Sequence, residues 1–366
     1  MTVSALGSGD GLDEDAGASE SPHLLGTWGY RTLIGVLVGV MVASIVVGIG
    51  AGAADIPVST TIDVLLHQLF GIGAAPDPVA VQIIWELRAP RVLMALVVGA
   101  GLSVAGCALQ AMVRNPLADP YIMGTAEGAT LGAVAVLVLG PAALGGIGVS
   151  MAAFIGAMTS MLLVFALARS RSGYAPGRLI LSGVALGYLF SAMTGILQFV
   201  SDPRELRGVL FWLLGSVAGT QWEDLGLPAF VVIASTAWLV LLSRRLNALA
   251  LGEESAVALG VDVQRFRVQL MVVTSVLVGA VVAVSGSIGF VGLMVPHAAR
   301  MLVGPDHRRV LPLSLLLGAA FLGAVDILAR VVAAPSELPL GIFTAAAGAP
   351  FFIWLLRRSQ RQIELG

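Results

Sequence analysis

The stretch from Arg244 to Arg267, RRLNALALGEESAVALGVDVQRFR, decides the fold, because it is a polar interruption between two long apolar runs. It is the most charge-dense part of a chain that otherwise avoids charge, with arginine pairs at both ends and two glutamates in the middle. Gly260 followed by Asp262 is typical of a helix end and the start of a new helix. The pattern predicts a short helix outside a membrane, between two helices that span it.

The composition of the chain places it in lipid. Of its 366 residues 57% are apolar and 11% are charged, and the mean hydropathy is +0.95. A soluble domain carries roughly 25% charged residues. All the basic residues are arginines, since the sequence contains no lysine. A P-loop lysine and a Schiff-base lysine are therefore excluded, and energy from ATP would have to come from another protein.

The remaining chemistry-bearing residues do not indicate an enzyme. Cys107, the one cysteine, lies in an apolar run and is expected to be a small core residue. The four histidines, at positions 23, 67, 297 and 307, lack metal-ligand spacing, and no hydrolase or dinucleotide-binding motif accompanies them. We expect no covalent or metal catalysis, and no cofactor or metal bound by this chain.

The predicted fold is all-α and polytopic, with about ten transmembrane helices. Residues 1–27 are predicted to be a disordered acidic cytoplasmic tail, and residues 28–366 the transmembrane domain. A negative flank argues against a secretory signal, so the first span is retained. The apolar spans are expected at residues 31–53, 91–112, 121–139, 148–168, 178–200, 225–243, 265–284, 288–303, 310–333 and 339–356. The eighth reaches only roughly 24 Å at about 1.5 Å per residue, which favours burial within the protein. Small residues within the spans, such as Gly106 and Gly128, are expected to pack helices closely.

Arginine placement predicts the orientation. With ten crossings, one side collects Arg114, Arg169, Arg171, Arg178, Arg244, Arg245, Arg265, Arg267, Arg300, Arg308, Arg309, Arg357, Arg358 and Arg361. This side is expected to be the cytoplasm and to contain both termini. The outer side holds Arg204 and Arg207 near a short helix at 204–216, and Arg88, Arg91 and Arg330 at helix ends.

The stretch 244–267 has two interpretations. It could be a solvated connector, which is common for a charged run. Its apolar positions are numerous for a solvated loop, however, which favours a surface partly covered by another protein. These positions are Leu249, Leu251, Ala256, Val257 and Leu259.

Several motifs, in order along the chain, resemble the FecCD-type permeases, the membrane subunits of ABC importers for iron-siderophores, haem and vitamin B12. LGEE at 251–254 with ALGV at 258–261 resembles the cytoplasmic coupling segment of that family. RAPR at 88–91 resembles its R-x-P-R motif, and NPLADP at 115–120 its NPLA-x-P turn. The stretches SIGFVGLMVPH at 287–297, GPDHRR at 304–309, ELPLG at 337–341 and GAPFF at 348–352 resemble its C-terminal signature.

The resemblance implies a type II ABC importer. Two ten-helix permease subunits, identical or paralogous, would enclose the pathway, with two ATPase subunits below and an extracytoplasmic substrate-binding protein above. ATP and Mg would be bound by the ATPase. Gly252, Glu253, Glu254 and Gly260 match the ATPase-coupling positions, and Arg88, Arg91 and Arg330 match positions that help to dock acidic residues of the binding protein. The chain would lie in the bacterial cytoplasmic membrane, surrounded by lipid and without a nucleic-acid partner.

The residues themselves leave some roles open. Arg88 and Arg91 could share a helix face across a proline that suits a helix start, or could snorkel to head groups. Asp326 and Arg330 have the spacing of a helical ion pair. His297 and Arg300 share a face and are candidate gate or pathway groups, although packing near a break at Pro296, whose freed carbonyls would need donors, is favoured.

The predicted function is import of a metal chelate, most simply a ferric siderophore, by a permease that a separate ATPase drives. Vitamin B12 or haem import is the alternative. An ion-coupled secondary transporter would need ionisable groups near the membrane midplane, and apart from Glu127 and Asp326, both toward helix ends, the spans contain few. Glu127 is expected to face other helices rather than lipid. A membrane-embedded enzyme would need converging catalytic groups, and none has recognisable spacing.

Overall fold

The structure is a computed structural model that describes residues 26–52, 56–170 and 173–364. The helices that match the predicted spans are α1 (Thr27–Gly50), α4 (Ala89–Val113), α5 (Thr125–Leu139), α6 (Val149–Ala168), α7 (Pro176–Val200), α9 (Trp222–Leu241), α12 (Val263–Ser285), α13 (Val291–Val303), α14 (His307–Val331) and α15 (Leu340–Glu364). The shorter elements are α2 (Val58–Phe70), α3 (Pro78–Val81), the π-helix η1 (Gln82–Arg88), the 3-10 helices η2 (Pro120–Met123) and η3 (Pro141–Leu144), α8 (Pro203–Leu214), α10 (Ser243–Ala250), α11 (Glu253–Ala258), and the paired strands β1 (Arg169–Ser170) and β2 (Gly173–Tyr174). The predicted acidic tail lies, except for its last two residues, outside the described residues.

The all-α polytopic prediction is confirmed. Within the described residues, seven helices are long and apolar enough to cross a membrane, and α5, α13 and the first part of α15 are shorter apolar helices. Together they account for the ten predicted spans. The eighth, α13, has only 13 residues, and most of its side chains are buried or half-buried, which agrees with a helix packed inside the protein. The chain is a multi-pass membrane protein.

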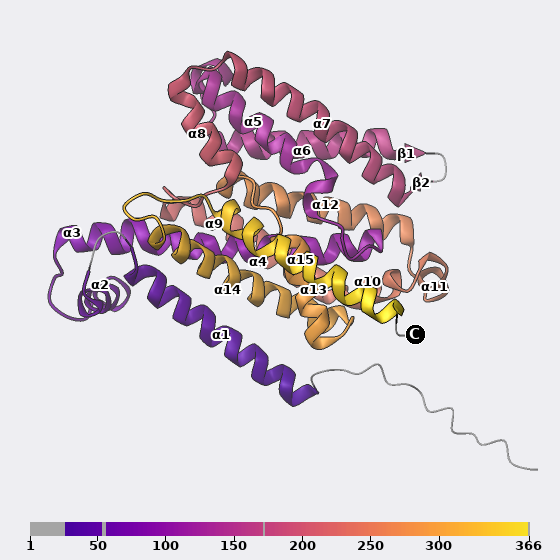
Figure 1. Ribbon diagram of the computed structural model, residues 1–366, viewed down its shortest axis with the longest axis horizontal. Coiled ribbons are helices and arrows are strands. Elements are labelled where there is room, and N and C mark those ends of the chain that lie inside the picture. Colours follow the sequence, from indigo (N-terminus) through magenta and orange to yellow (C-terminus); the bar gives the residue numbers. More distant parts are fainter. Residues whose placement is uncertain (1–25, 53–55, 171–172, 365–366) are drawn as a thin grey trace, which may run out of the picture.

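Helix α4 lies at the centre of the bundle, between α12 and α14 (Figure 1). It is apolar all round, as a fully buried helix should be, and nearly all its side chains are buried. Small residues allow its close contacts. A Cβ on Gly99 would lie 2.2 Å from the Gly318 oxygen of α14, and one on Gly106 would lie 1.8 Å from the Gly292 oxygen of α13. The predicted packing role of Gly106 is thus confirmed.

The prediction that a helix starts at the R-x-P-R motif is wrong. The helix is continuous from Pro78 through α3, η1 and α4, so Pro90 lies inside a run of 36 residues. A proline inside an α-helix has no N–H to donate and clashes with the carbonyl four residues earlier. The π-helical turn just before Pro90 shifts the bonding to five residues, as in the bond from the Ala89 N–H to Ile84, and this adapts the backbone to the proline.

Two further differences concern short helices. The stretch 244–267 contains α10 and α11 rather than one short helix, because Gly252 adopts a φ of +124° between them, a conformation that side chains rarely allow. Helix α2 was not anticipated, since it is too short to span and partly polar. The predicted stop and start were right, because Gly260 has a φ of +78° and the Asp262 carboxylate accepts a hydrogen bond from the Arg265 N–H.

The bundle has two polar ends. The start of α1, the end of α15, α10 and α11 lie at one end, here called the coupling end (Figure 1). Tyr30 of α1 and Arg309 of α14 meet there, with the guanidinium 5.7 Å from the ring centre. The start of α4 and the end of α14 lie at the opposite end (Figure 1), here called the arginine end because it holds Arg88, Arg91 and Arg330. Both described chain ends therefore lie on the side of the stretch 244–267, as the arginine pattern predicts.

Candidate functional site

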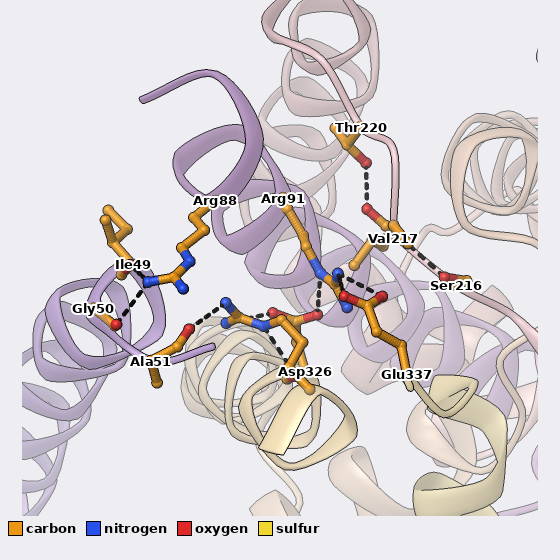
Figure 2. Close-up of polar contacts among 12 residues, drawn as sticks. Ile49, Gly50, Ala51, Arg88, Arg91, Ser216, Val217, Thr220, Asp326 and Glu337 are labelled. Carbon is orange, nitrogen blue, oxygen red and sulfur yellow. Dashed lines mark hydrogen bonds and ion pairs between the residues drawn. The ribbon is translucent and has the colours of Figure 1, made fainter. Parts of the chain in front are cut away.

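Arg91 is the centre of a buried ion-pair network at the arginine end (Figure 2). Its Nε lies 2.8 Å from Asp326 Oδ1, and its Nη1 lies 2.7 Å from Glu337 Oε1. Asp326 also pairs with Arg330 one turn further along α14, at 2.9 Å. The predicted Asp326–Arg330 pair is confirmed. A completely buried carboxylate between two guanidinium groups satisfies the condition under which charges are tolerated inside a protein.

Arg88 and Arg330 also hold the end of α1, and Figure 2 shows the contacts of Arg88. Arg88 Nη1 donates to the carbonyls of Ile49 and Gly50, at 3.2 and 2.7 Å, and Arg330 Nη1 donates to that of Ala51 at 2.8 Å. The last carbonyls of a helix lack partners within it and carry a partial negative charge. The two arginines therefore tie α1 to α4 and α14.

This geometry limits the accessible charge at the arginine end. Arg88, Arg91 and Arg330 are only 7%, 8% and 4% exposed, so their guanidinium groups are turned inward rather than toward head groups. Arg88 and Arg91 do not act on one partner, because Arg88 reaches α1 while Arg91 reaches α14 and the segment after it. Glu337, with a side chain 40% exposed, is the accessible member of the network.

At the coupling end the two glutamates have different surroundings. Glu253 Oε1 lies 2.6 Å from Nη2 of Arg267, which is 1% exposed, and 3.8 Å from Nη2 of Arg114. Arg267 also donates to the Tyr174 carbonyl, at 2.6 Å. Glu253 thus joins α11 to α12, and Arg267 in turn joins α12 to β2, while Glu254 is exposed.

The apolar side chains of the stretch 244–267 are divided between the core and the surface. Leu249 and Ala256 are completely buried and hold α10 and α11 against the bundle. Leu251, Val257 and Leu259 are 73%, 63% and 66% exposed. Three exposed aliphatic side chains within nine residues, beside Glu254, form an apolar surface with a charged rim, here called the α11 surface. Such surfaces are typical of protein contacts.

Asn247 connects α10 to the beginning of α14. Its amide nitrogen donates to Asp306 at 2.7 Å, and its amide oxygen accepts from the His307 N–H at 2.9 Å. Burial alone raises the pKa of Asp306, but hydrogen bonds from the Arg308 N–H and the Asn247 amide outweigh it, so the pKa lies below its ordinary value. Asp306 is therefore an ionised N-cap of α14, and its contact with Asn247 holds α14 to α10.

The predicted break at Pro296 is wrong, because α13 continues through this proline; the carbonyls near it do accept hydrogen bonds from a side chain, that of Gln110. Gln110 of α4 donates to the carbonyls of Gly292 and Leu293, both at 3.3 Å, and Gly292 is the residue that a non-proline at 296 would bond. Arg300 donates to the Gln110 side-chain oxygen and so orients this amide. His297 instead packs edge-on against Phe351 of α15, with ring centres 6.0 Å apart. The structure therefore gives His297 and Arg300 different neighbours.

Four residues in these contacts received no role from the sequence: Gln110, Asn247, Arg267 and Glu337. Their partners are 14 to 246 residues away along the chain. Local spacing could not reveal such contacts. Two weak signals were available. Gln110 is a glutamine inside an otherwise apolar span, and Arg267 is an arginine near the start of another span.

The structure is a helical, multi-pass bundle with a polar network at each end. The chain belongs to the FecCD transport family, which matches residues 37–358.

Individual relatives agree with this family. The cobalamin import system permease protein BtuC of Halobacterium salinarum is 46% identical over 75% of this chain and 73% of its own length. The uncharacterized ABC transporter permease protein YvrB of Bacillus subtilis is 41% identical over 88% and 92%, and the hemin transport system permease protein HmuU of Yersinia pestis is 41% identical over 76% and 84%. A chain from a metal-chelate type ABC transporter, solved in an inward-facing conformation, superimposes with a TM-score of 0.77 at 35% identity, over 90% of this chain and 100% of that one. The chain is a permease subunit of the ABC-importer class.

Proposed function

We propose that this chain forms half of the transmembrane pathway of an ABC importer for a metal chelate in a bacterial cytoplasmic membrane, with a ferric siderophore as the first candidate cargo. A second permease subunit, identical or paralogous, completes the pathway, and a substrate-binding protein delivers the cargo from outside. Two ATPase subunits bind ATP and Mg and supply the energy. This chain catalyses no reaction itself.

The α11 surface carries this proposal. Leu251, Val257 and Leu259 are exposed at a polar end of the bundle, where contact with lipid tails cannot explain them. A partner that covers them gains apolar contact, and Glu254 at their edge fixes its register. With no lysine for a nucleotide-binding loop in this chain, an ATPase is the partner that fits an importer.

Cobalamin is the second candidate cargo, because the relative at 46% identity is named for its import. Haem is supported in the same way by the relative from Yersinia pestis. The test is ATP-dependent uptake into proteoliposomes that contain this chain, its ATPase and its binding protein, with a ferric siderophore, cobalamin and haemin as separate cargoes. Uptake by this chain without any ATPase would overturn the proposal.

The two glutamates provide a sharper test of coupling. Glu254→Ala should leave the permease folded but lower cargo uptake per ATP hydrolysed, because only the contact with the partner is lost. Glu253→Ala should instead lower thermal stability, because it removes the carboxylate partner of buried Arg267. Glu205→Ala, an exposed glutamate on α8, is the matched control. Unchanged coupling in Glu254→Ala would count against a docking role of the α11 surface.

Arg88, Arg91 and Arg330 remain the proposed docking site for acidic residues of the binding protein. Glu337 of this chain already pairs with Arg91, so a carboxylate of the binding protein would have to share Arg91 with Glu337 or displace Glu337. Glu337→Gln should therefore raise the affinity for the binding protein at low salt, with the gain fading as salt is added. If the wild-type permease and Glu337→Gln bind the binding protein with equal affinity at all salt concentrations, the result would argue against docking at Arg91.

A further inference from the structure

Two adjoining cavities follow one side of α7. They have volumes of about 400 and 390 Å³, and both are lined by Glu127 of α5 and Ser191 of α7. Ser191, Thr194 and Gln198 recur at intervals of three and four residues, so they share one face of α7. Thr130 and Ser287 add hydroxyl groups on the other sides of the second cavity. A polar strip of this kind is unusual inside membrane spans.

Glu127 lies where the two cavities meet. Its Oε2 is buried and has no hydrogen-bond partner among the described residues. The carboxylate lies beside Gly187 of α7, where an added Cβ would come within 3.9 Å of Oε2. The ion pairs within the described ranges belong to Glu253, Asp326 and Glu337, so none of them neutralises Glu127.

Thr194 repeats this pattern in the second cavity. It is only 4% exposed, and its Oγ1 also has no hydrogen-bond partner in the described part of the chain. Buried polar atoms at membrane depth are costly unless a partner satisfies them. The two residues that carry these atoms line adjoining cavities, which indicates a wall that is completed by a ligand passing through.

The chemistry of this wall defines its ligand. An ionised carboxylate can only accept hydrogen bonds, whereas the hydroxyl and amide groups along α7 can both accept and donate them, so Glu127 sets the preference of this wall. The complementary surface carries N–H or O–H donors or positive charge. A ligand edge with carboxylates would be repelled by Glu127, because like charges cannot approach closely in a site of low dielectric.

We propose that Glu127, with Thr194 and Gln198, forms a cargo-contact site in the translocation pathway that selects chelates with amide, ammonium or other donor groups on their surface over chelates with surface carboxylates. This site rests on the proposed importer function and defines its substrate class more narrowly.

The test compares three probes in proteoliposomes with the complete importer: cobalamin, which has amide groups at its edge, ferrioxamine B, which is cationic, and haemin, which has two carboxylates. Glu127→Gln keeps the shape of the side chain and removes its charge. We expect about tenfold slower uptake of the donor-edged probes, because charge-assisted hydrogen bonds are about twice as strong as neutral ones, and no slower uptake of haemin.

Two further variants separate the site from folding effects. Asp63→Asn removes an exposed carboxylate on α2 and should leave all uptake rates unchanged. Gly187→Ala keeps Glu127 but adds a methyl group beside it in the wall of the first cavity, so it should reduce uptake of the same probes as Glu127→Gln.

The outcomes distinguish the site from the importer itself. Equal loss of all three probes in a folded Glu127→Gln complex, or no loss of any, would overturn the site while leaving the importer in place. Faster wild-type uptake of haemin than of both other probes would also overturn it. If the wild-type complex takes up none of the probes in the presence of ATP, the proposed function fails, and the site fails with it.

Discussion

The ion-pair network at the arginine end gives the sharpest prediction on stability. Asp326 is completely buried and is held at 2.8 Å by Arg91 and at 2.9 Å by Arg330. Asp326→Asn keeps the size of the side chain and removes its charge. Arg91 would keep Glu337, but the new amide offers one acceptor oxygen to only one of the two guanidinium groups and turns its NH2 group toward the other. Removing one partner from a buried ion pair costs about 3–5 kcal/mol, and we expect a loss in the free energy of unfolding of that size.

Glu337→Gln is the matched control, because it removes the other carboxylate on Arg91. The Glu337 side chain is 40% exposed and therefore screened by solvent, so the expected loss is about 1 kcal/mol or less. The assay is reversible unfolding in mixed detergent micelles, at low and at high salt. Added salt should reduce the effect of Glu337→Gln and leave that of Asp326→Asn unchanged. A loss below about 1 kcal/mol for Asp326→Asn, or equal losses in the two variants, would refute the reasoning about buried charge.

Two other contacts give predictions for the same unfolding assay. Gln110→Leu should cost about 2–3 kcal/mol, because the Gly292 carbonyl and the Arg300 guanidinium lose their partner. Gln110→Glu should restore only the contact with Arg300, so full recovery in Gln110→Glu would contradict the role of Gln110 as a donor. Asp306→Ala should cost about 1 kcal/mol at neutral pH, as the loss of an N-cap. Since the folded pKa of Asp306 is below the ordinary value of about 3.9, this difference should persist above that pH and disappear as the pH falls through the folded value. A difference that does not change with pH would mean that the charge of Asp306 is not involved.

The features of the fold that depend on local sequence were predictable. Apolar run length is sufficient to indicate a span, and the ten runs correspond to helices. The Asp262 cap and the Asp326–Arg330 pair involve residues within one helical turn of each other, and both predictions were confirmed. The region before Pro90 was not predictable in the same way, because a π-helical turn has no marked sequence pattern of its own.

The polar networks required the three-dimensional structure. Arg91 and Asp326 are 235 residues apart, and the partner of Arg300 is 190 residues away. A charge near the end of a span can face lipid head groups, another protein or the interior, and the sequence pattern is similar in all three cases. The structure places the arginines of the R-x-P-R motif in the interior, and it separates Glu253 from Glu254, although the two are neighbours in the sequence.

Helix α14 contacts the polar networks at both ends of the bundle, so a rigid movement of this helix at one end also moves its contacts at the other end. Asn247 holds its first residue, and the Asp326 and Arg330 pairs lie near its last turn. Its 25 residues span roughly 37 Å at about 1.5 Å per residue. A tilt of about 5° at the coupling end would move the other end by roughly 3 Å, as the sine of that angle over this length requires. That displacement is as large as the Arg91–Asp326 contact itself, so the hydrogen bond from Arg330 to the Ala51 carbonyl and the ion pairs of Arg91 could not all persist through such a tilt.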